Sequence, residues 1–378
     1  MIGPYKAKEN YKISYTGNKL FENIDSINGS RPRKELIENR VKNIGTEEMW
    51  HHISEINNRI NLSSNLFFSQ MNSLFTLLPL TTRMISSPGA VYGKEKIDYT
   101  SDTSPITLNW FDQKKKVFLS ESSQLYLELS LTQKEISSVY SIYNSFRKEK
   151  ADETHLSEFH HIEFEGKVNA KENEDVAIGL LKRILDDLIK HNKKNLEYFL
   201  SDEKIEELIS FKNNIFDIPR ITFKEALELL YKETKNEKYK TFTSKHFGDW
   251  EEIKLTEIFQ NMVLIREYPL LEVPFYHDPT KNRNPQTANN FDIIWPGYRE
   301  IIGGGLRIAN KEVLEEKAKI FNLPKEDYEP YLYSRSFSNY CQTSGFGLGW
   351  ERLLQAIIET PYIWTASHFP RIDKTLKP

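Results

Sequence analysis

The chain has 378 residues, of which 39% are hydrophobic and 12% aromatic, enough for one large domain or two to three ordinary ones. Lysine and arginine number 51 against 54 aspartate and glutamate, so there is no global basic field, and contact with nucleic acid would rest on a local patch. The single cysteine, Cys341, excludes an internal disulfide and is expected to be a small buried residue in a reducing compartment. No run of about 18 apolar residues and no apolar signal segment occurs, so we expect a soluble, cytoplasmic protein without membrane contact.

Residues 1–45 form a polar segment with a basic cluster at 30–34. We expect a solvated arm that packs on the body of the protein; the alternative is an arm that binds an acceptor or a partner. Apolar residues recur with a spacing of about 3.6 from residue 46 to residue 78. This pattern predicts a long helix with a break near 61–64, followed by a strand at 81–87.

The middle of the chain predicts a strand and then a helix at 116–131, with polar residues at the junction that can face a ligand. An amphipathic helix is predicted at 174–199. Thr222 is expected to cap the helix that follows it, because its hydroxyl can accept a hydrogen bond from a backbone N–H of the first turn.

The last third of the chain alternates short strands and turns. Strands are expected at 291–295 and 300–302, and residues 270–276 are expected to continue the same sheet. A glycine-rich run at 345–349 opens a predicted helix at 350–358.

This alternation predicts an α+β fold, with an antiparallel or mixed sheet flanked by helices rather than regular βαβ repeats. We expect the arm at 1–45 to be followed by one large domain at 46–378. That domain would carry a helical elaboration at about 174–260.

Residues 145–165 combine a charged loop with two predicted strands. Strand periodicity places one set of polar and aromatic side chains on a single face: Phe159, His161, Glu163 and Glu165. On a surface hairpin these side chains would be solvated, whereas beneath a charged ligand they would be contacts. A zinc site is disfavoured because strand alternation separates His160 from His161 and no cysteine lies nearby.

The run Gly345–Gly349 resembles a cradle for an anion, since glycines let backbone N–H groups approach a phosphate at the start of a helix. Its pattern is Gly-x-Gly-x-Gly, which is neither a dinucleotide fingerprint nor a P-loop. Glu351 and Arg352 follow directly, and an arginine in that first turn can reach a phosphate or stack on a base.

Together these stretches resemble the three signature motifs of class II aminoacyl-tRNA synthetases, in the order that the class has them. Motif 1 corresponds to the long helix, the next strand and Pro88, motif 2 to residues 146–165, and motif 3 to residues 345–352. Residues 119–128 and 300–308 are similar to the aspartyl/asparaginyl branch, and to asparaginyl-tRNA synthetases in particular.

The resemblance, which covers about residues 47–378, implies that ATP and an amino acid react to form an aminoacyl-adenylate. The implied catalytic residues are Arg147, Glu149 and Arg352. The implied ATP ligands are Arg147, Glu149, His155, Phe159, Glu300 and Arg352. The implied amino-acid ligands are Ser122, Gln124, Glu163 and Arg307.

Individual roles follow from the same resemblance. Arg147 would hold the α-phosphate and the amino-acid carboxylate, and Phe159 and Arg352 would enclose the adenine. Glu300 and Asp292 would hold Mg²⁺, whose preferred ligands are hard carboxylate oxygens. Further implied contacts are His155 with the γ-phosphate, Ser122, Gln124 and Glu163 with the α-ammonium group, and Arg307 with the substrate side-chain oxygen. A homodimer is implied, with Pro88 at its interface.

The sequence also departs from the family pattern. Leu127 stands where aspartyl enzymes have a lysine that pairs with the substrate carboxylate, which favours asparagine over aspartate. Thr154 replaces an arginine, and Gly305 replaces a serine that contacts the metal. Residues 1–45 cannot supply an anticodon-binding OB barrel, which needs roughly 100 residues of short strands. The missing barrel and Gly305 also resemble archaeal asparagine synthetases derived from this branch, but those retain the lysine-type pairing with aspartate that Leu127 lacks.

Three functions therefore remain open. The first is activation of asparagine, or a close analogue, with transfer to tRNA or another acceptor. The second is activation of aspartate for amidation by ammonia. The third is a catalytically weakened paralogue that acts as a binding or regulatory module.

Overall fold

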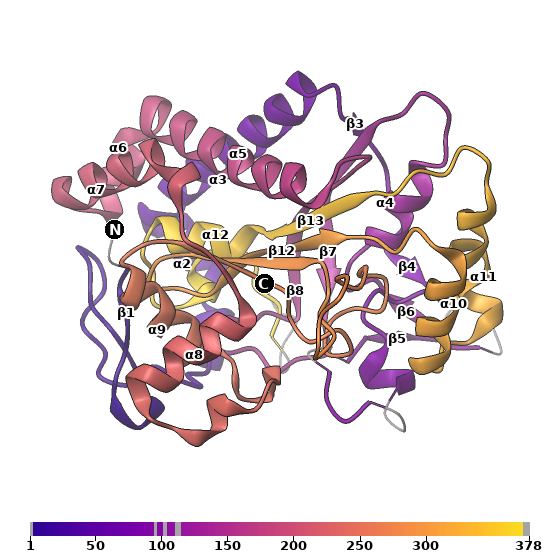
Figure 1. The fold of residues 1–378 in the computed structure, drawn as a ribbon. Coiled ribbons are helices and arrows are strands. Elements are labelled where there is room, and N and C mark those ends of the chain that lie inside the picture. The colour runs from indigo at the N-terminus through magenta and orange to yellow at the C-terminus, as the bar shows by residue number, and fades with distance from the viewer. Residues whose placement is uncertain (1–2, 94–96, 101–103, 110–114, 373–378) are drawn as a thin grey trace.

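The computed structural model describes residues 3–93, 97–100, 104–109 and 115–372. Its centre is an eight-stranded sheet with the order β3-β7-β8-β13-β12-β11-β10-β9 (Figure 1). The strands are β3 (Leu74–Phe75), β7 (Ser138–Phe146), β8 (Glu158–Gly166), β13 (Ser344–Gly349), β12 (Glu300–Leu306), β11 (Asn290–Ile294), β10 (Val263–Arg266) and β9 (Arg220–Thr222). Neighbours from β7 to β10 pair antiparallel, whereas β3 and β9 pair parallel at the edges. The predicted mixed sheet of an α+β fold is thus confirmed.

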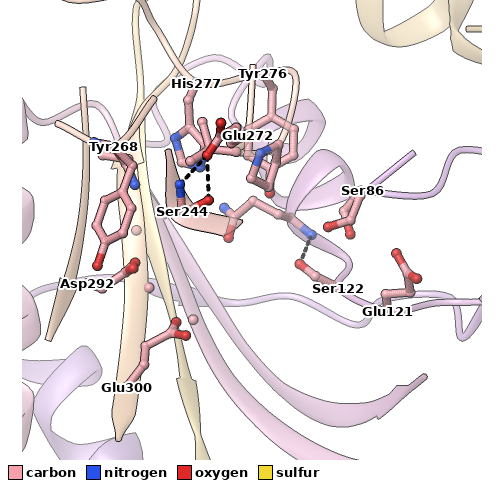
Figure 2. A pocket seen from close by; sticks show the side chains of 18 of the residues that line it. Ser86, Glu121, Ser122, Ser244, Tyr268, Glu272, Tyr276, His277, Asp292 and Glu300 are labelled. Atoms are coloured by element: carbon pink, nitrogen blue, oxygen red, sulfur yellow. Dashed lines mark hydrogen bonds between the residues drawn. The ribbon is translucent and has the colours of Figure 1, made fainter. Parts of the chain in front are cut away.

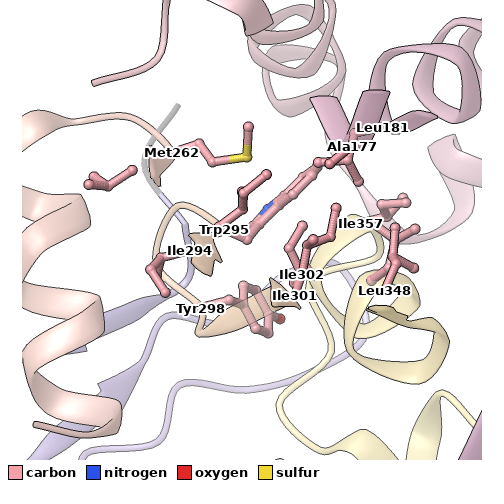
Figure 3. Close-up of a cluster of buried hydrophobic side chains, with 14 of the residues drawn as sticks. Ala177, Leu181, Met262, Ile294, Trp295, Tyr298, Ile301, Ile302, Leu348 and Ile357 are labelled. Carbon is pink, nitrogen blue, oxygen red and sulfur yellow. The ribbon is translucent and has the colours of Figure 1, made fainter. Parts of the chain in front are cut away.

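The helices that cover one face of this sheet are α3 (Met49–Gln70), α5 (Ala170–His191) and α12 (Trp350–Ile357). Helix α5 packs on β12 and β13, and α12 packs on β8. Figure 3 shows the resulting core, in which Trp295 and Ile302 from the sheet side meet Ala177 and Leu181 of α5. The opposite face of the central strands is therefore left to line a cavity.

Helix α3 is continuous, and the predicted break near residues 61–64 is wrong. Ser63 and Ser64 are buried inside the helix. The hydroxyl of Ser64 donates a hydrogen bond of 2.8 Å to the carbonyl oxygen of Ile60 one turn earlier. This local bond satisfies the serine within the helix, so the polar residues that suggested a loop do not interrupt it.

Helices dominate residues 170–259. They are α5, α6 (Lys193–Phe199), α7 (Asp202–Asn213), α8 (Phe223–Thr234) and α9 (Asp249–Phe259). The predicted cap is confirmed, because the Thr222 hydroxyl accepts from the Glu225 N–H at 3.2 Å while the Glu225 carboxylate accepts from the Thr222 N–H at 2.7 Å. The single helix predicted at 174–199 is in fact two, since Asn192 has a non-helical φ of −125° between α5 and α6.

The N-terminal segment packs along the body of the protein. Its elements are β1 (Tyr5–Ala7), β2 (Ile13–Tyr15), α1 (Lys34–Glu38) and α2 (Arg40–Thr46). The Tyr5 hydroxyl donates to the carbonyl oxygen of Pro361 at 2.5 Å, and its ring lies edge-on to Tyr298. Arg31 donates to the carbonyl oxygens of Lys150 and Ala151 at 3.0 and 2.6 Å. The basic cluster therefore includes a structural anchor.

A second group of helices lies beside a small sheet at the other end of the molecule (Figure 1). The group comprises α4 (Gln124–Ser130), α10 (Lys311–Ile320) and α11 (Lys325–Tyr333), and the small sheet comprises β4 (Thr81–Thr82), β5 (Thr107–Leu108) and β6 (Val117–Leu119). The strand predicted at 81–87 is thus only two residues long. Short helical turns complete the fold: η1 (Glu9–Tyr11), η2 (Gly89–Gly93), η3 (Ile215–Asp217), η4 (Glu237–Lys240), η5 (Ser244–His246), η6 (Ser334–Ser336) and η7 (Ile363–Thr365).

Two further expectations are wrong. Residues 270–276 do not extend the sheet, because Pro269 and Pro274 lack the N–H that a sheet ladder requires. Cys341 is exposed rather than buried. In the parts of the chain that the structure describes, no helix combines the length and apolar character needed to cross a membrane.

Candidate active site

Two adjoining cavities open on the sheet face that the core helices leave free. The larger has a volume of about 300 Å³ and the smaller about 70 Å³. Their walls share four residues: Arg147, His161, Glu300 and Gly347. Every residue that the sequence assigned to ATP, amino acid or metal lines one of the two cavities, although these residues lie up to 230 positions apart in the chain, from Ser122 to Arg352.

The run Gly345–Gly349 belongs to strand β13 in the middle of the sheet, and the predicted helix α12 begins directly after it at Trp350. The strand pairs with β8 on one side and β12 on the other. A Cβ atom on Gly345 would collide with the carboxylate of Glu165 and the backbone of Phe164. Because these glycines have no side chains, β13 can pair closely with β8 without displacing the Glu165 side chain.

Strand β8 has the two faces that its periodicity predicted. Phe159, His161 and Glu163 line the cavities. On the other face, Ile162 and Phe164 are fully buried in the core. Burial and the nearby arginines lower the pKa of His161 to about 3, so its imidazole is neutral at pH 7 and contributes no positive charge.

The smaller cavity is lined by aromatic and cationic groups. The Arg147 guanidinium lies over the Phe159 ring, 5.2 Å from its centroid. Arg352 donates to the Glu300 carbonyl oxygen at 2.9 Å, and its Nη2 lies 3.0 Å from Nε2 of His155. Glu149 lines the same cavity. A cavity lined by a phenylalanine ring and two arginine side chains suits the flat base and the phosphates of a purine nucleotide.

Thr154, which replaces an arginine of the family, is buried and faces its own loop. Its N–H donates to Asp152 at 2.9 Å, and His155 Nδ1 lies 2.8 Å from the same carboxylate oxygen. Burial opposes ionisation of Asp152, but the hydrogen bond and charge of His155 outweigh it and lower its pKa. The loop is therefore ordered around Asp152, a residue that the sequence did not single out.

The larger cavity begins at the junction of β6 and α4. Ser122 donates to Glu163 at 2.7 Å, and Gln124 donates to the carboxylate of Glu165. Burial raises the pKa of Glu163 to about 7, while hydrogen bonds from Tyr143 and Ser122 and the charges of Arg307 and Arg147 oppose that rise. A cationic group placed beside Glu163 would favour its ionised form.

Arg307 is held in a buried network of alternating charge. Its Nη2 donates to Glu165 at 2.9 Å, and its Nε lies 3.9 Å from Glu128. Glu128 also accepts from Arg335 at 2.7 Å and from the Tyr331 hydroxyl at 2.8 Å. The sequence interpretation missed Glu128, although it follows Gln124 by four positions and so shares its helix face.

Three acidic residues, Glu252, Asp292 and Glu300, line the larger cavity and influence one another through their charges, and Glu300 also lines the smaller cavity. Burial raises the pKa of Asp292 well above its usual value, and the charges of Glu300 and Glu252 add to the effect. Burial, with Asp249 and Glu300, raises the pKa of Glu252 to about 8. A Cβ atom on Gly303 would lie 2.6 Å from Glu300 Oε1 and 3.4 Å from Asp292 Oδ1. The missing side chain therefore leaves both carboxylates open to a cation, which would relieve their repulsion.

Other wall residues come from segments without a motif. Figure 2 shows Tyr268 beside Asp292, and Tyr276, His277, Glu272 and Ser244 grouped at another end of the cavity. Glu272 accepts from both the N–H and the hydroxyl of Ser244, at 2.5 and 2.6 Å, which fixes the loop before α9 over the cavity. The sequence analysis did not identify Glu252 of α9 either, because it also lies outside the sequence motifs.

Two residues of the resemblance lie away from the cavities. Leu127 is fully buried against Leu131 and Val139, so it places no charge near the larger cavity. Pro88 is buried within the single chain, immediately before η2.

Comparison with known proteins agrees with this geometry. Residues 100–373 match the family model of tRNA synthetases class II (D, K and N). The asparagine–tRNA ligase of Pyrococcus abyssi is 34% identical over 278 residues, which are 72% of this chain and 60% of the relative. That of Thermus thermophilus is 30% identical over 331 residues, 86% of this chain and 70% of the relative.

Among solved structures, the asparaginyl-tRNA synthetase of Pyrococcus horikoshii complexed with asparaginyl-adenylate has a TM-score of 0.79 and 26% identity. The match covers 92% of this chain and 74% of that one. Aspartyl-tRNA synthetase of Entamoeba histolytica, with 21% identity and a TM-score of 0.69, shares the fold over 92% of this chain and 64% of its own. The chain spans about 60% of the length of the archaeal relatives that it matches. It belongs to the class II tRNA synthetases of the D, K and N family.

Proposed function

We propose that this protein activates asparagine with ATP, forming asparaginyl-adenylate and pyrophosphate, and then transfers the asparaginyl group to the end of a tRNA. The observation that carries the proposal is the junction of the two cavities at Arg147 and Glu300. A nucleotide in one cavity and an amino acid in the other would meet there. The adenylate in the similar Pyrococcus horikoshii structure supports the same arrangement.

Arg147 would act at the point of reaction. Its guanidinium is shared by both cavities and could hold the amino-acid carboxylate and the α-phosphate together. The carboxylate oxygen attacks the α-phosphorus and the bond to pyrophosphate breaks, so negative charge builds up on oxygens that fixed cations can stabilise. Phe159 and Arg352 would hold the adenine, and His155 and Glu149 would hold the rest of the nucleotide.

The amino group of the substrate would bind at Ser122, Gln124 and Glu163. Glu163 is buried and its pKa is about 7 without a bound cation, so an ammonium group would draw it into the ionised form. Because Ser122 donates to Glu163, the hydroxyl fixes the direction of the carboxylate. These groups would thus position the amino acid rather than react with it.

Asparagine is favoured because the side-chain end of the cavity is close to neutral. Arg307 would donate to the side-chain carbonyl oxygen, but its charge is already balanced by Glu165 and Glu128. A buried arginine with two carboxylate neighbours has little charge left to stabilise a third carboxylate. Leu127 adds no cation there. A neutral amide is the better complement, although aspartate stays a candidate for measurement.

Asp292 and Glu300 would hold Mg²⁺ together with the nucleotide. Within the described ranges, no group of three or more His, Cys, Asp or Glu side chains is placed to hold a metal ion alone. Magnesium is commonly bound by one or two carboxylates plus substrate phosphates, which fits this pair. When bound, the ion would neutralise phosphate charge and favour departure of pyrophosphate.

A homodimer is supported by an exposed apolar surface on α3 and the following strand. This surface consists of Leu62, Leu66, Leu74, Phe75, Leu77 and Leu80. Strand β3 is also an edge of the large sheet, so its free side is open to another chain. A second copy of the chain would cover these side chains.

ATP–pyrophosphate exchange with each amino acid, repeated with and without tRNA, tests the proposal. We expect exchange with asparagine and, with tRNA present, asparaginyl-tRNA. Exchange with aspartate followed by ammonia-dependent formation of asparagine would support amidation instead. ATP binding without exchange for any amino acid would support a binding or regulatory module.

A further inference from the structure

His277 is a buried residue in the wall of the larger cavity and belongs to none of the sequence motifs. It follows Tyr276 and faces the cavity from the segment between β10 and β11 (Figure 2). An isolated antiparallel bridge pairs its backbone with that of Arg307. Lys317 donates to its carbonyl oxygen at 3.0 Å, so the segment is fixed from behind. The imidazole therefore stands beside the group proposed to bind the substrate side chain.

One nitrogen of this imidazole lacks a partner. Nδ1 is buried and makes no hydrogen bond to any residue that the structure describes. His277 as a whole is only 6% exposed. A buried polar atom is costly to leave unsatisfied, so an unpartnered nitrogen on a cavity wall is a strong candidate for contact with a ligand.

The imidazole of His277 is neutral. Burial, Arg307 and Lys317 lower the pKa of His277 well below its usual value, against an opposing effect of the backbone of Leu306. A neutral imidazole has one donor and one acceptor nitrogen. We assign the acceptor to Nδ1, the ring nitrogen that has no partner among the described residues, and the proton to Nε2.

Gly305 makes this position of the ring possible. Gly303 and Gly305 alternate along β12, and Arg307 directly follows the strand. A Cβ atom on Gly305 would lie 2.6 Å from Nδ1 of His277 and 2.6 Å from the carbonyl oxygen of Asn289. The departure from serine to glycine is therefore tied to the position of His277, which lines the same cavity as Arg307.

We propose that His277 determines specificity by accepting a hydrogen bond from the side-chain N–H of the amino acid while Arg307 donates to its side-chain carbonyl oxygen. This inference rests on the proposed activation of asparagine. An amide offers one donor and one acceptor to this pair of groups. An aspartate carboxylate has no N–H, and it would place an anionic oxygen against the lone pair of Nδ1.

The test compares His277→Leu, which removes the acceptor at similar size, with His277→Gln, which keeps an acceptor oxygen. Pyrophosphate exchange is measured with asparagine and with aspartate, and binding of the asparaginyl and aspartyl sulfamoyl-adenosine analogues is measured by calorimetry. We expect His277→Leu to lose about 10-fold in affinity and in kcat/KM for asparagine but not for aspartate, the effect of one hydrogen bond to a buried group. His277→Gln should retain most of the preference.

These measurements distinguish a failure of the role of His277 from a failure of the proposed activation of asparagine. If the wild-type protein exchanges with asparagine and His277→Leu keeps its preference over aspartate, the role of His277 is wrong while the proposed function stands. Equal losses for both amino acids would also overturn it, since a purely structural role predicts them. If the wild-type protein neither exchanges with asparagine nor binds its analogue, both proposals fall. Thermal unfolding of each variant shows whether the fold is retained.

Discussion

Arg307 and Glu165 form a buried ion pair in which Nη2 lies 2.9 Å from Oε2. Both side chains are almost fully shielded from solvent, and burial raises the pKa of Glu165 to about 7 against the opposing charge of Arg307. The pair thus links β8 to the residue that directly follows β12, about 140 positions later in the sequence. Its strength decides both the shape of the larger cavity and the charge that a substrate meets there.

Removing the charge of Glu165 should destabilise the protein. Glu165→Gln leaves Arg307 with only the more distant Glu128, and breaking one partner of a buried pair costs about 3 kcal/mol. The free energy of unfolding from urea titration measures the loss. The same change at the exposed Glu233 is the matched control and should have almost no effect. A Glu165→Gln protein as stable as the control would contradict a structural role for the pair.

Removing Arg147 should abolish adenylate formation. Arg147→Ala is expected to lower kcat/KM in pyrophosphate exchange by roughly 10³-fold, because a preorganised cation is lost from the point where charge develops. Arg147→Lys should recover only part, since an ammonium group cannot bridge two ligands in the same way. The exposed Lys224 on α8, changed to alanine, is the control. Exchange retained in Arg147→Ala would refute the assignment of the site.

Binding of asparagine should strengthen as the pH rises through about 7. Burial raises the pKa of Glu163 to about 7, and only its ionised form pairs with an ammonium group. From pH 8 to pH 6 the affinity should therefore fall by roughly 10-fold. The KM for asparagine in pyrophosphate exchange reports the change.

Stability should respond to pH in the opposite direction at this residue. The folded-state pKa of Glu163 is raised above that of the unfolded chain, so the folded protein binds more protons between about pH 4.5 and 7. Its contribution to stability is therefore lost as the pH rises through that interval. Glu163→Gln should remove this slope from the free energy of unfolding, together with the pH dependence of KM. An unchanged slope in both would exclude Glu163 as the source.

Neutralising Asp292 should separate stability from activity. Its pKa is raised by burial and by repulsion from Glu300 and Glu252, so Asp292→Asn should raise the unfolding temperature measured without magnesium or ATP. The same variant should need a higher magnesium concentration for exchange, or lose exchange altogether. A lower unfolding temperature with unchanged magnesium dependence would show that Asp292 stabilises the fold instead.

Removing Arg31 should weaken the binding of ATP, although Arg31 itself would not contact the nucleotide. Arg31 holds the loop at Lys150 and Ala151, and Gly29 holds the same loop through a bond of 3.0 Å to Glu153. Arg31→Ala is expected to raise KM for ATP several-fold while kcat changes little, since the loss of one or two hydrogen bonds is about 1 kcal/mol. Arg33→Ala, at a neighbouring exposed residue, is the control. Equal effects of the two changes would exclude a role in positioning.

Sequence periodicity predicted the site best where the residues lie on regular elements. Strict alternation in β8 was enough to group Phe159, His161 and Glu163, because successive side chains of a strand point to opposite faces. No comparable sequence pattern predicted that Glu252, Ser244 and His277 line the cavity. They reach the cavity only because α9 and two loops fold back over the sheet. The resemblance supplied no motif there, and local patterns contain no information about such long-range contacts.

The glycine-rich strand shows the opposite limitation. Glycines at the start of a helix suggested a cradle for an anion but gave no sign that Gly345 and Gly347 belong to a central strand. Local propensity disfavours glycine in strands, but the neighbouring strands and the bulky side chains of β8 override it. The closeness of Glu165 to Gly345 is visible only in three dimensions.

The attachment of the N-terminal arm has a consequence for synthesis of the protein. Tyr5 rests against Tyr298 and Pro361, and Arg31 reaches a loop made more than a hundred residues later. A ribosome delivers the arm first, but its docking surface is incomplete until the last part of the chain has emerged. Tyr5 therefore cannot reach its final partners until residue 361 has been made, whereas Arg31 can bind its loop once residues 150 and 151 have emerged. The two ends of the arm thus dock at different stages of translation.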